Sequence, residues 1–259
     1  MKGLDQLWVS GKKIFISGVI LGVGAELFGI LQQSGPSIPA SRWLRRIRMK
    51  LILTAIEQPL ADAWTKFCGD LDFVSVHRGS IVDVECDAVV SPANSYGFMD
   101  GGIDAVYLSH FGSEIQTRVR RQILEHHQGE LLVGNADVVA TGNESIPFLI
   151  AAPTMRVPMN LHESVNPYLA ARAVFVLISN GTFSSGALAG KRISDYIKRV
   201  ALPGLGTGVG KVGFNTCAHQ VRAAINDIVL KQYRMPQSWA EASERHQLLY
   251  TTKLKRLQY

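Results

Sequence analysis

Short apolar runs alternate along this chain with longer segments whose apolar residues recur at helical spacing. The short runs predict strands at residues 51–56, 73–77, 87–90, 148–152 and 200–202. The periodic segments predict helices at residues 59–68, 103–111, 113–126, 167–178 and 216–232. Ser113 and Gln116 have the spacing of a capping box at the start of the third helix. Strands that alternate with helices in this way predict a three-layer α/β domain with a mainly parallel sheet.

The two ends of the chain do not follow this alternation. Residues 14–31 are apolar and rich in glycine, with Glu26 as their one carboxylate, and basic residues flank them. This length is slightly below the about 20 apolar residues of a membrane span, so a membrane anchor or signal, an organelle-targeting segment and an upstream extension all remain open. Met49 opens the first predicted strand. We therefore expect an N-terminal extension at 1–48, a folded domain at 49–233 and a C-terminal helical extension at 234–259.

The formal charge of +6 is concentrated at the ends of the chain. Residues 1–49 carry a net +5 and residues 234–259 a net +3, which leaves the middle at −2. A domain without a basic surface is not expected to bind nucleic acid. The three cysteines are Cys68, Cys86 and Cys217, which form no metal-binding pattern. We expect buried thiols, no metal and a reducing compartment such as the cytoplasm.

A glycine-rich segment follows the last predicted strand. Residues 202–213 contain five glycines and lie immediately before the helix at 216–232. Backbone N–H groups at a helix start have no intrahelical acceptor, and the helix dipole favours an anion there, so this order predicts a phosphate site. The glycine spacing fits neither a Walker A loop nor a dinucleotide fingerprint. The alternative is a turn that only reverses the chain.

A second segment of the same kind spans residues 87–104. It runs from an apolar strand through a polar, glycine-rich stretch into the helix at 103. Two such loops offer two sets of N–H donors, which suits a diphosphate. The amide of Asn94 can donate to and accept from sugar hydroxyls, and Asp104 can orient a water or accept from a ribose hydroxyl. For Asp104 the alternative is helix capping or dipole compensation.

These motifs together resemble the macro domain family. Residues 87–94 end in an Ala-Asn step, residues 101–104 read Gly-Gly-Ile-Asp, residues 150–155 resemble the family's central strand, and residues 204–213 resemble its diphosphate loop. The resemblance covers about residues 50–232, and the wording of residues 91–104 is similar to a bacterial and phage-tail-like branch. It implies an α/β/α sandwich with a mixed, mainly parallel sheet, no cofactor, and ADP-ribose or ADP-ribosylated protein as partner.

The resemblance also implies a role for each matching position. The ligand-binding positions are Ser80, Ile81, Asn94, Gly101, Gly102, Gly206, Thr207, Gly208, Val209 and Gly210, and the catalytic ones are Asp104 and Asn94. Three positions depart from the family pattern. Ser80 replaces an acidic residue that reads adenine, Ser91 replaces an asparagine, and Gly210 stands where several members carry an aromatic that covers the distal ribose. The candidates for stacking on adenine are Tyr96, Phe98, Tyr168 and Phe214.

The expected function is ADP-ribose binding. Some family members also hydrolyse ADP-ribose 1''-phosphate or ADP-ribosyl esters, and here a water held by Asp104 and the ligand's phosphate is expected to attack directly, without a metal. The alternatives are a non-catalytic reader or structural module, and a different nucleotide in the same pocket. Residues 14–31 are the one segment through which membrane association is open.

Overall fold

The fold is known from a computed structural model that describes residues 7–9, 12–14 and 49–255. The chain divides into two units, residues 1–45 and 46–259. In the first unit, β1 (Leu7–Val9) and β2 (Lys12–Ile14) form an antiparallel pair. The rest of the apolar run at 14–31 lies outside the described residues, so its role stays a prediction. Within the described ranges, no helix combines the length and the apolar character that a membrane crossing requires.

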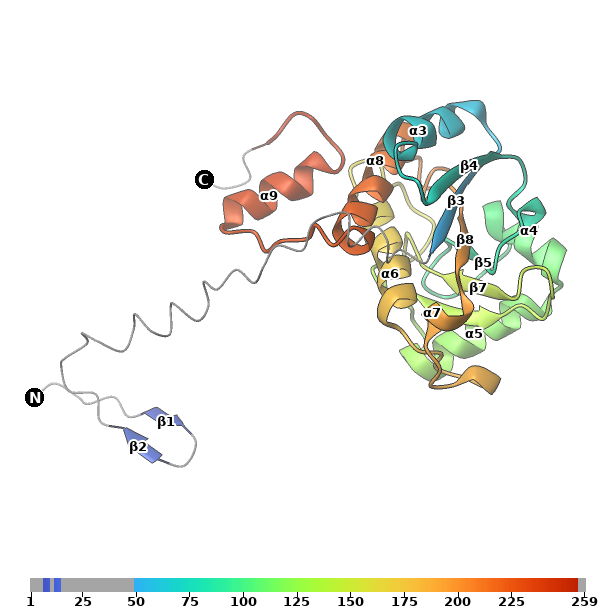
Figure 1. The fold of residues 1–259 in the computed structure, drawn as a ribbon, viewed down its shortest axis with the longest axis horizontal. Helices are drawn as coiled ribbons and strands as arrows, with labels where there is room; N and C mark the ends of the chain where they lie inside the picture. Colours follow the sequence, from blue (N-terminus) through green and yellow to red (C-terminus); the bar gives the residue numbers. More distant parts are fainter. Residues whose placement is uncertain (1–6, 10–11, 15–48, 256–259) are drawn as a thin grey trace, which may run out of the picture. The chain divides into compact units, whose positions relative to one another are not determined.

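A six-stranded sheet forms the centre of the second unit (Figure 1). The strand order is β4-β3-β8-β5-β7-β6. Every pairing is parallel except that of β6 with β7, so the sheet is mixed and mainly parallel, as predicted. The strands are β3 (Lys50–Ala55), β4 (Val74–Arg78), β5 (Ala88–Ser91), β6 (Asp137–Ala140), β7 (Phe148–Ala151) and β8 (Arg199–Leu202).

Helices cover both faces of this sheet (Figure 1). One face packs against α3 (Gln58–Cys68), α6 (Asn166–Asn180) and α8 (Phe214–Ala224), and the other against α4 (Gly102–Phe111) and α5 (Glu114–His127). Successive strand residues alternate between the two cores: Val90 faces the first group of helices and Val89 the second. Burial on both faces explains why these strands read as continuous apolar runs.

Four features depart from the predicted elements. The short edge strand β6 and the single turn α7 (Ile193–Tyr196) were not expected. The helix predicted to reach residue 232 changes at Ile225 into a π-helical turn, η3 (Ile225–Val229). The expected capping box is wrong, because Gln116 Oε1 accepts a hydrogen bond from Met99 N at 2.8 Å and Ser113 makes no side-chain cap. Two short 3₁₀ turns, η1 (Ile81–Asp83) and η2 (Gly186–Leu188), and the C-terminal helix α9 (Trp239–Leu248) complete the described elements.

Candidate functional site

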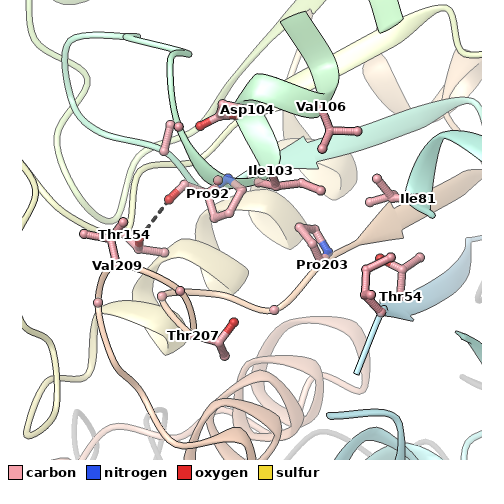
Figure 2. Close-up of a pocket in the computed structure, with 18 of the residues that line it drawn as sticks. Thr54, Ile81, Pro92, Ile103, Asp104, Val106, Thr154, Pro203, Thr207 and Val209 are labelled. Atoms are coloured by element: carbon pink, nitrogen blue, oxygen red, sulfur yellow. Dashed lines mark hydrogen bonds between the residues drawn. The ribbon is translucent and has the colours of Figure 1, made fainter. Parts of the chain in front are cut away.

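A cavity of about 460 Å³ lies at the carboxyl ends of the five parallel strands. This is the edge at which open α/β sheets bind ligands. All eleven residues predicted to form the site line this one cavity, namely Ser80, Ile81, Asn94, Gly101, Gly102, Asp104, Gly206, Thr207, Gly208, Val209 and Gly210. Figure 2 shows Asp104, Thr154 and Val209 toward one end and Thr54 and Ile81 toward the other. The structure therefore brings the two predicted loops together, while the contact of each residue with a ligand stays a prediction.

The loop after β8 presents its backbone to the cavity. Among the described residues, the N–H groups of positions 206–210 have no hydrogen-bond acceptor, whereas the flanking N–H groups of Lys211 and Val212 bond to Gly208 O and Gly206 O, both at 3.1 Å. Gly206 has a φ of +67°, a left-handed conformation that glycine adopts without strain. The loop is thus held at its base, and its tip leaves N–H donors for an anion.

Gly208 and Gly210 differ in the space around them. A Cβ at Gly208 would have no neighbour within 4 Å, whereas a Cβ at Gly210 would lie 2.6 Å from Gly206 O and 2.9 Å from Leu161 Cδ1. This backbone therefore has no room at position 210 for the aromatic side chain that the family resemblance implies there. The side chain of Val209 is 57% exposed and lines the cavity.

Asn94 shapes the second loop from within. Its Oδ1 accepts hydrogen bonds from Tyr96 N at 3.1 Å and Phe98 N at 3.2 Å, and its Nδ2 donates to Phe98 O at 2.8 Å. The amide thereby closes a turn in its own chain, a common use of asparagine in loops. The structure thus gives Asn94 a positioning role that the sequence did not reveal. A contact with sugar hydroxyls would be additional to these bonds.

Asp104 contributes a buried carboxyl group to the site. It stands in the first turn of α4, is 5% exposed, and its Oδ1 accepts a hydrogen bond from Ser91 Oγ at 2.5 Å. Burial raises the pKa of the Asp104 carboxyl from 3.8 to about 7, and the hydrogen bond from Ser91 opposes that rise. Ser91 itself is buried behind the cavity wall. The cavity therefore contains a carboxyl that changes protonation near neutral pH.

The end of the cavity at β3 and β4 is more apolar. Ile81 is buried, Ile56 is 68% exposed and Val106 is 38% exposed, and all three line the cavity beside Ser80. A mainly apolar slot with a few polar groups suits a flat heteroaromatic ring. Of the predicted stacking residues, Phe98 and Phe214 line the cavity and the other two do not. The Tyr168 hydroxyl instead donates to Asp227 Oδ2 at 2.7 Å, and Tyr96 lies against the Arg156 guanidinium.

Sequence reasoning missed several lining residues. Thr154 follows β7, and its Oγ1 donates to Pro92 O at 2.8 Å, which ties the end of β7 to the loop after β5 (Figure 2). Glu57 and Asp100 also line the cavity. Thr154 lies in segment 150–155, whose resemblance to the family's central strand could have identified it. Nothing in the local sequence marks Glu57 or Asp100. Within the described part of the chain, no cluster of His, Cys, Asp or Glu is arranged to hold a metal ion.

Comparisons with known proteins agree with this architecture. The sequence model of the Macro domain family matches residues 90–221, about half of the chain, so the protein belongs to the macro domain family. An uncharacterized protein of Aquifex aeolicus is 33% identical over 155 residues, which cover 60% of this chain and 80% of that protein. An uncharacterized protein of Aeropyrum pernix is 30% identical over 151 residues, 58% of this chain and 69% of that protein.

Several solved structures also resemble this chain. The macrodomain of Mycobacterium tuberculosis DarG is 20% identical with a TM-score of 0.47, and the match covers 58% of this chain and 88% of that one. The Oceanobacillus iheyensis macrodomain with ADP is 16% identical with a TM-score of 0.47 over 66% of this chain and 84% of that one. The Trypanosoma brucei macrodomain in complex with ADP-ribose is 15% identical with a TM-score of 0.46 over 83% of this chain and 82% of that one.

Proposed function

We propose that this protein binds ADP-ribose in the cavity at the carboxyl ends of its strands. The observation that carries the proposal is the row of N–H groups at positions 206–210, which have no acceptor among the described residues. These positions line the cavity together with the second glycine-rich loop. These donors suit the diphosphate. The apolar slot around Ile81 suits adenine, and the end at Asp104 suits the distal ribose. A volume of about 460 Å³ lies in the range of ligand pockets.

Calorimetric titration of the full chain with ADP-ribose and with AMP tests this proposal. Micromolar affinity corresponds to about −8 kcal/mol, and we expect it for ADP-ribose only, because AMP lacks the second phosphate and the distal ribose. Gly208→Leu is the informative variant. Open space surrounds its Cβ, so the side chain is expected to fill the cavity without disturbing the fold.

Gly213→Leu is the matched control. Position 213 does not line the cavity, and its Cβ would have an ordinary contact at 3.8 Å with Thr216 Oγ1. We expect Gly208→Leu to abolish ADP-ribose binding and Gly213→Leu to retain it. Equal binding of AMP and ADP-ribose, or full binding by Gly208→Leu, would contradict the proposed site.

A second candidate function is hydrolysis of ADP-ribosyl derivatives, and the Asp104 carboxyl favours it. A buried carboxyl with a pKa of about 7 is suited to hold a water and accept its proton at neutral pH. The water oxygen would bond to C1'' of the distal ribose, the bond from C1'' to the leaving oxygen would break, and the leaving group would take a proton. The products would be ADP-ribose and the released acid, alcohol or phosphate.

Turnover and binding separate this candidate from a non-catalytic reader. An ADP-ribosyl ester and ADP-ribose 1''-phosphate are incubated with the full chain, and ADP-ribose release is followed by chromatography. An enzyme would release ADP-ribose. Asp104→Asn would slow this release by at least about 100-fold, because a general base usually accelerates a reaction by that factor or more. A reader would bind ADP-ribose and release none. Loss of binding in Asp104→Asn with turnover intact would contradict the role given to Asp104.

A further inference from the structure

The ionisable side chains that line the cavity are all acidic. Of the lining residues that the structure describes, these are Glu57, Asp100 and Asp104, and none is a lysine, arginine or histidine. Asp100 is exposed in the loop that runs from β5 into α4, four residues before Asp104. Glu57 follows β3 and belongs to the loop beside the Ile81 end. The segment that leads into α4 therefore brings a second carboxyl, that of Asp100, to the cavity that Asp104 lines.

The basic side chains near this loop are engaged elsewhere. The Arg120 guanidinium lies 4.2 Å from the Phe98 ring centroid and donates to Tyr96 O at 3.1 Å. Arg156 donates to the Glu130 carboxylate at 2.6 and 3.2 Å. Lys211 follows the last lining residue of the glycine loop but does not itself line the cavity. Arg120, Arg156 and Lys211 therefore lie outside the cavity lining of the described part of the chain.

Anion binding in this cavity therefore depends on backbone N–H groups. Positions 206–210 provide one set, and the first turn of α4, which begins at Gly102, provides the other. In the proposed function, these two sets would bind the two phosphates of the diphosphate. A further phosphate on the distal ribose would reach the Asp104 end. The charged lining residues that the structure describes are carboxylates, and like charges at short range repel.

From this charge distribution we propose that the cavity selects ADP-ribosyl compounds whose group beyond the distal ribose carries no negative charge, and that Asp100 is a specificity-determining residue. This inference rests on the proposed function and narrows it. The favoured substrates are esters and other uncharged or cationic adducts at C1'', and a terminal phosphate monoester is disfavoured. Asp100 acts by repulsion, which is a common way to build specificity.

The test compares two ligands across three proteins. The full chain, Asp100→Asn and Asp195→Asn are titrated with ADP-ribose and with ADP-ribose 1''-phosphate at pH 8 and 50 mM NaCl. Phosphorus NMR of the same samples reports that the phosphate ester is intact. Asp195 lies on α7, is exposed and does not line the cavity, so its variant changes the total charge equally.

We expect the wild-type protein to bind the 1''-phosphate roughly tenfold more weakly than ADP-ribose, from Coulomb repulsion at a few ångströms near a protein surface. The measured ratio is the dissociation constant for the 1''-phosphate divided by that for ADP-ribose. Asp100→Asn should reduce this ratio severalfold, and Asp195→Asn should leave it unchanged. Raising NaCl to 500 mM should also reduce the wild-type ratio, because salt screens exposed charges.

Three results overturn the inference while leaving the proposed function intact, provided that ADP-ribose binds. They are a 1''-phosphate that binds as tightly as ADP-ribose, a ratio that Asp100→Asn does not change, and a ratio that salt does not change. Failure of both ligands to bind the wild-type protein would instead overturn the proposed function, and this inference with it.

Discussion

Replacing Asp104 by asparagine is predicted to stabilise the protein at alkaline pH. The carboxyl is 5% exposed, and burial raises its pKa from 3.8 to about 7. Because the folded-state pKa lies above the unfolded value, the favourable contribution of the protonated carboxyl is complete below about pH 3.8. It is lost as the pH rises through about 7. Asparagine has nearly the same shape and can still accept the hydrogen bond from Ser91, but it carries no charge at any pH.

The expected magnitude follows from the size of the shift. A change of about three pKa units corresponds to about 4 kcal/mol between the two protonation states. Of this stabilisation, roughly 2.5 kcal/mol is lost between pH 5 and pH 8, and the rest is lost below pH 5. The free energy of unfolding of the wild-type protein, relative to that of Asp104→Asn, should therefore fall by roughly 2.5 kcal/mol over this interval.

Urea unfolding of the full chain, followed by tryptophan fluorescence, measures this difference at pH 5, 6, 7 and 8. Trp64 is fully buried and reports the loss of the core. Asp195→Asn, at an exposed position on α7, serves as the control and should show a constant difference from wild type. A constant difference between wild type and Asp104→Asn over the same pH range would refute the argument that this carboxyl is destabilised by burial.

Three further predictions follow from the site and the core. Gly210→Ala should lower the free energy of unfolding by about 1–3 kcal/mol, because the added Cβ would lie 2.6 Å from Gly206 O. Gly208→Ala, whose Cβ has no neighbour within 4 Å, should not lower it. Equal effects of the two variants in urea unfolding would contradict this prediction. Ser91→Ala should raise the pKa of Asp104 further in a ¹³C NMR titration, since it removes a hydrogen bond that lowers that pKa; an unchanged or lower pKa would argue against the contact. Burial raises the pKa of Cys68 and Cys217 to about 12 and of Cys86 to about 11, so Ellman's reagent should label these thiols only after unfolding, and rapid labelling of the native protein would count against their burial.

The fold was largely predictable because its strands carry a strong local signal. The core strands β3, β5 and β8 are buried on both faces, and uninterrupted apolar runs mark them. The edge strand β6 was missed because it begins at a buried aspartate, Asp137, and contains only two consecutive valines. Asp137 is accommodated by hydrogen bonds from Gln122 and Ser184 and a 2.9 Å contact with His127, partners that no local pattern reveals.

The site was predictable as a set of positions but not as a set of contacts. Glycine spacing and strand–loop–helix order identified the loops that line the cavity. The bond between Ser91 and Asp104 joins residues 13 apart, which meet only because the end of β5 lies beside the first turn of α4. The internal bonds of Asn94 depend on the turn that this side chain itself closes. Such roles follow from tertiary geometry and cannot be read from residue type alone.

The central claim is that backbone N–H groups of two glycine loops bind the diphosphate of ADP-ribose. Amide chemical shifts of the ¹⁵N-labelled full chain, recorded during titration with ADP-ribose, test it most directly. We expect the largest shifts at residues 206–210 and in the first turn of α4, with smaller shifts beside Ile81. Shifts confined to other surfaces, or none at saturating ligand, would contradict it.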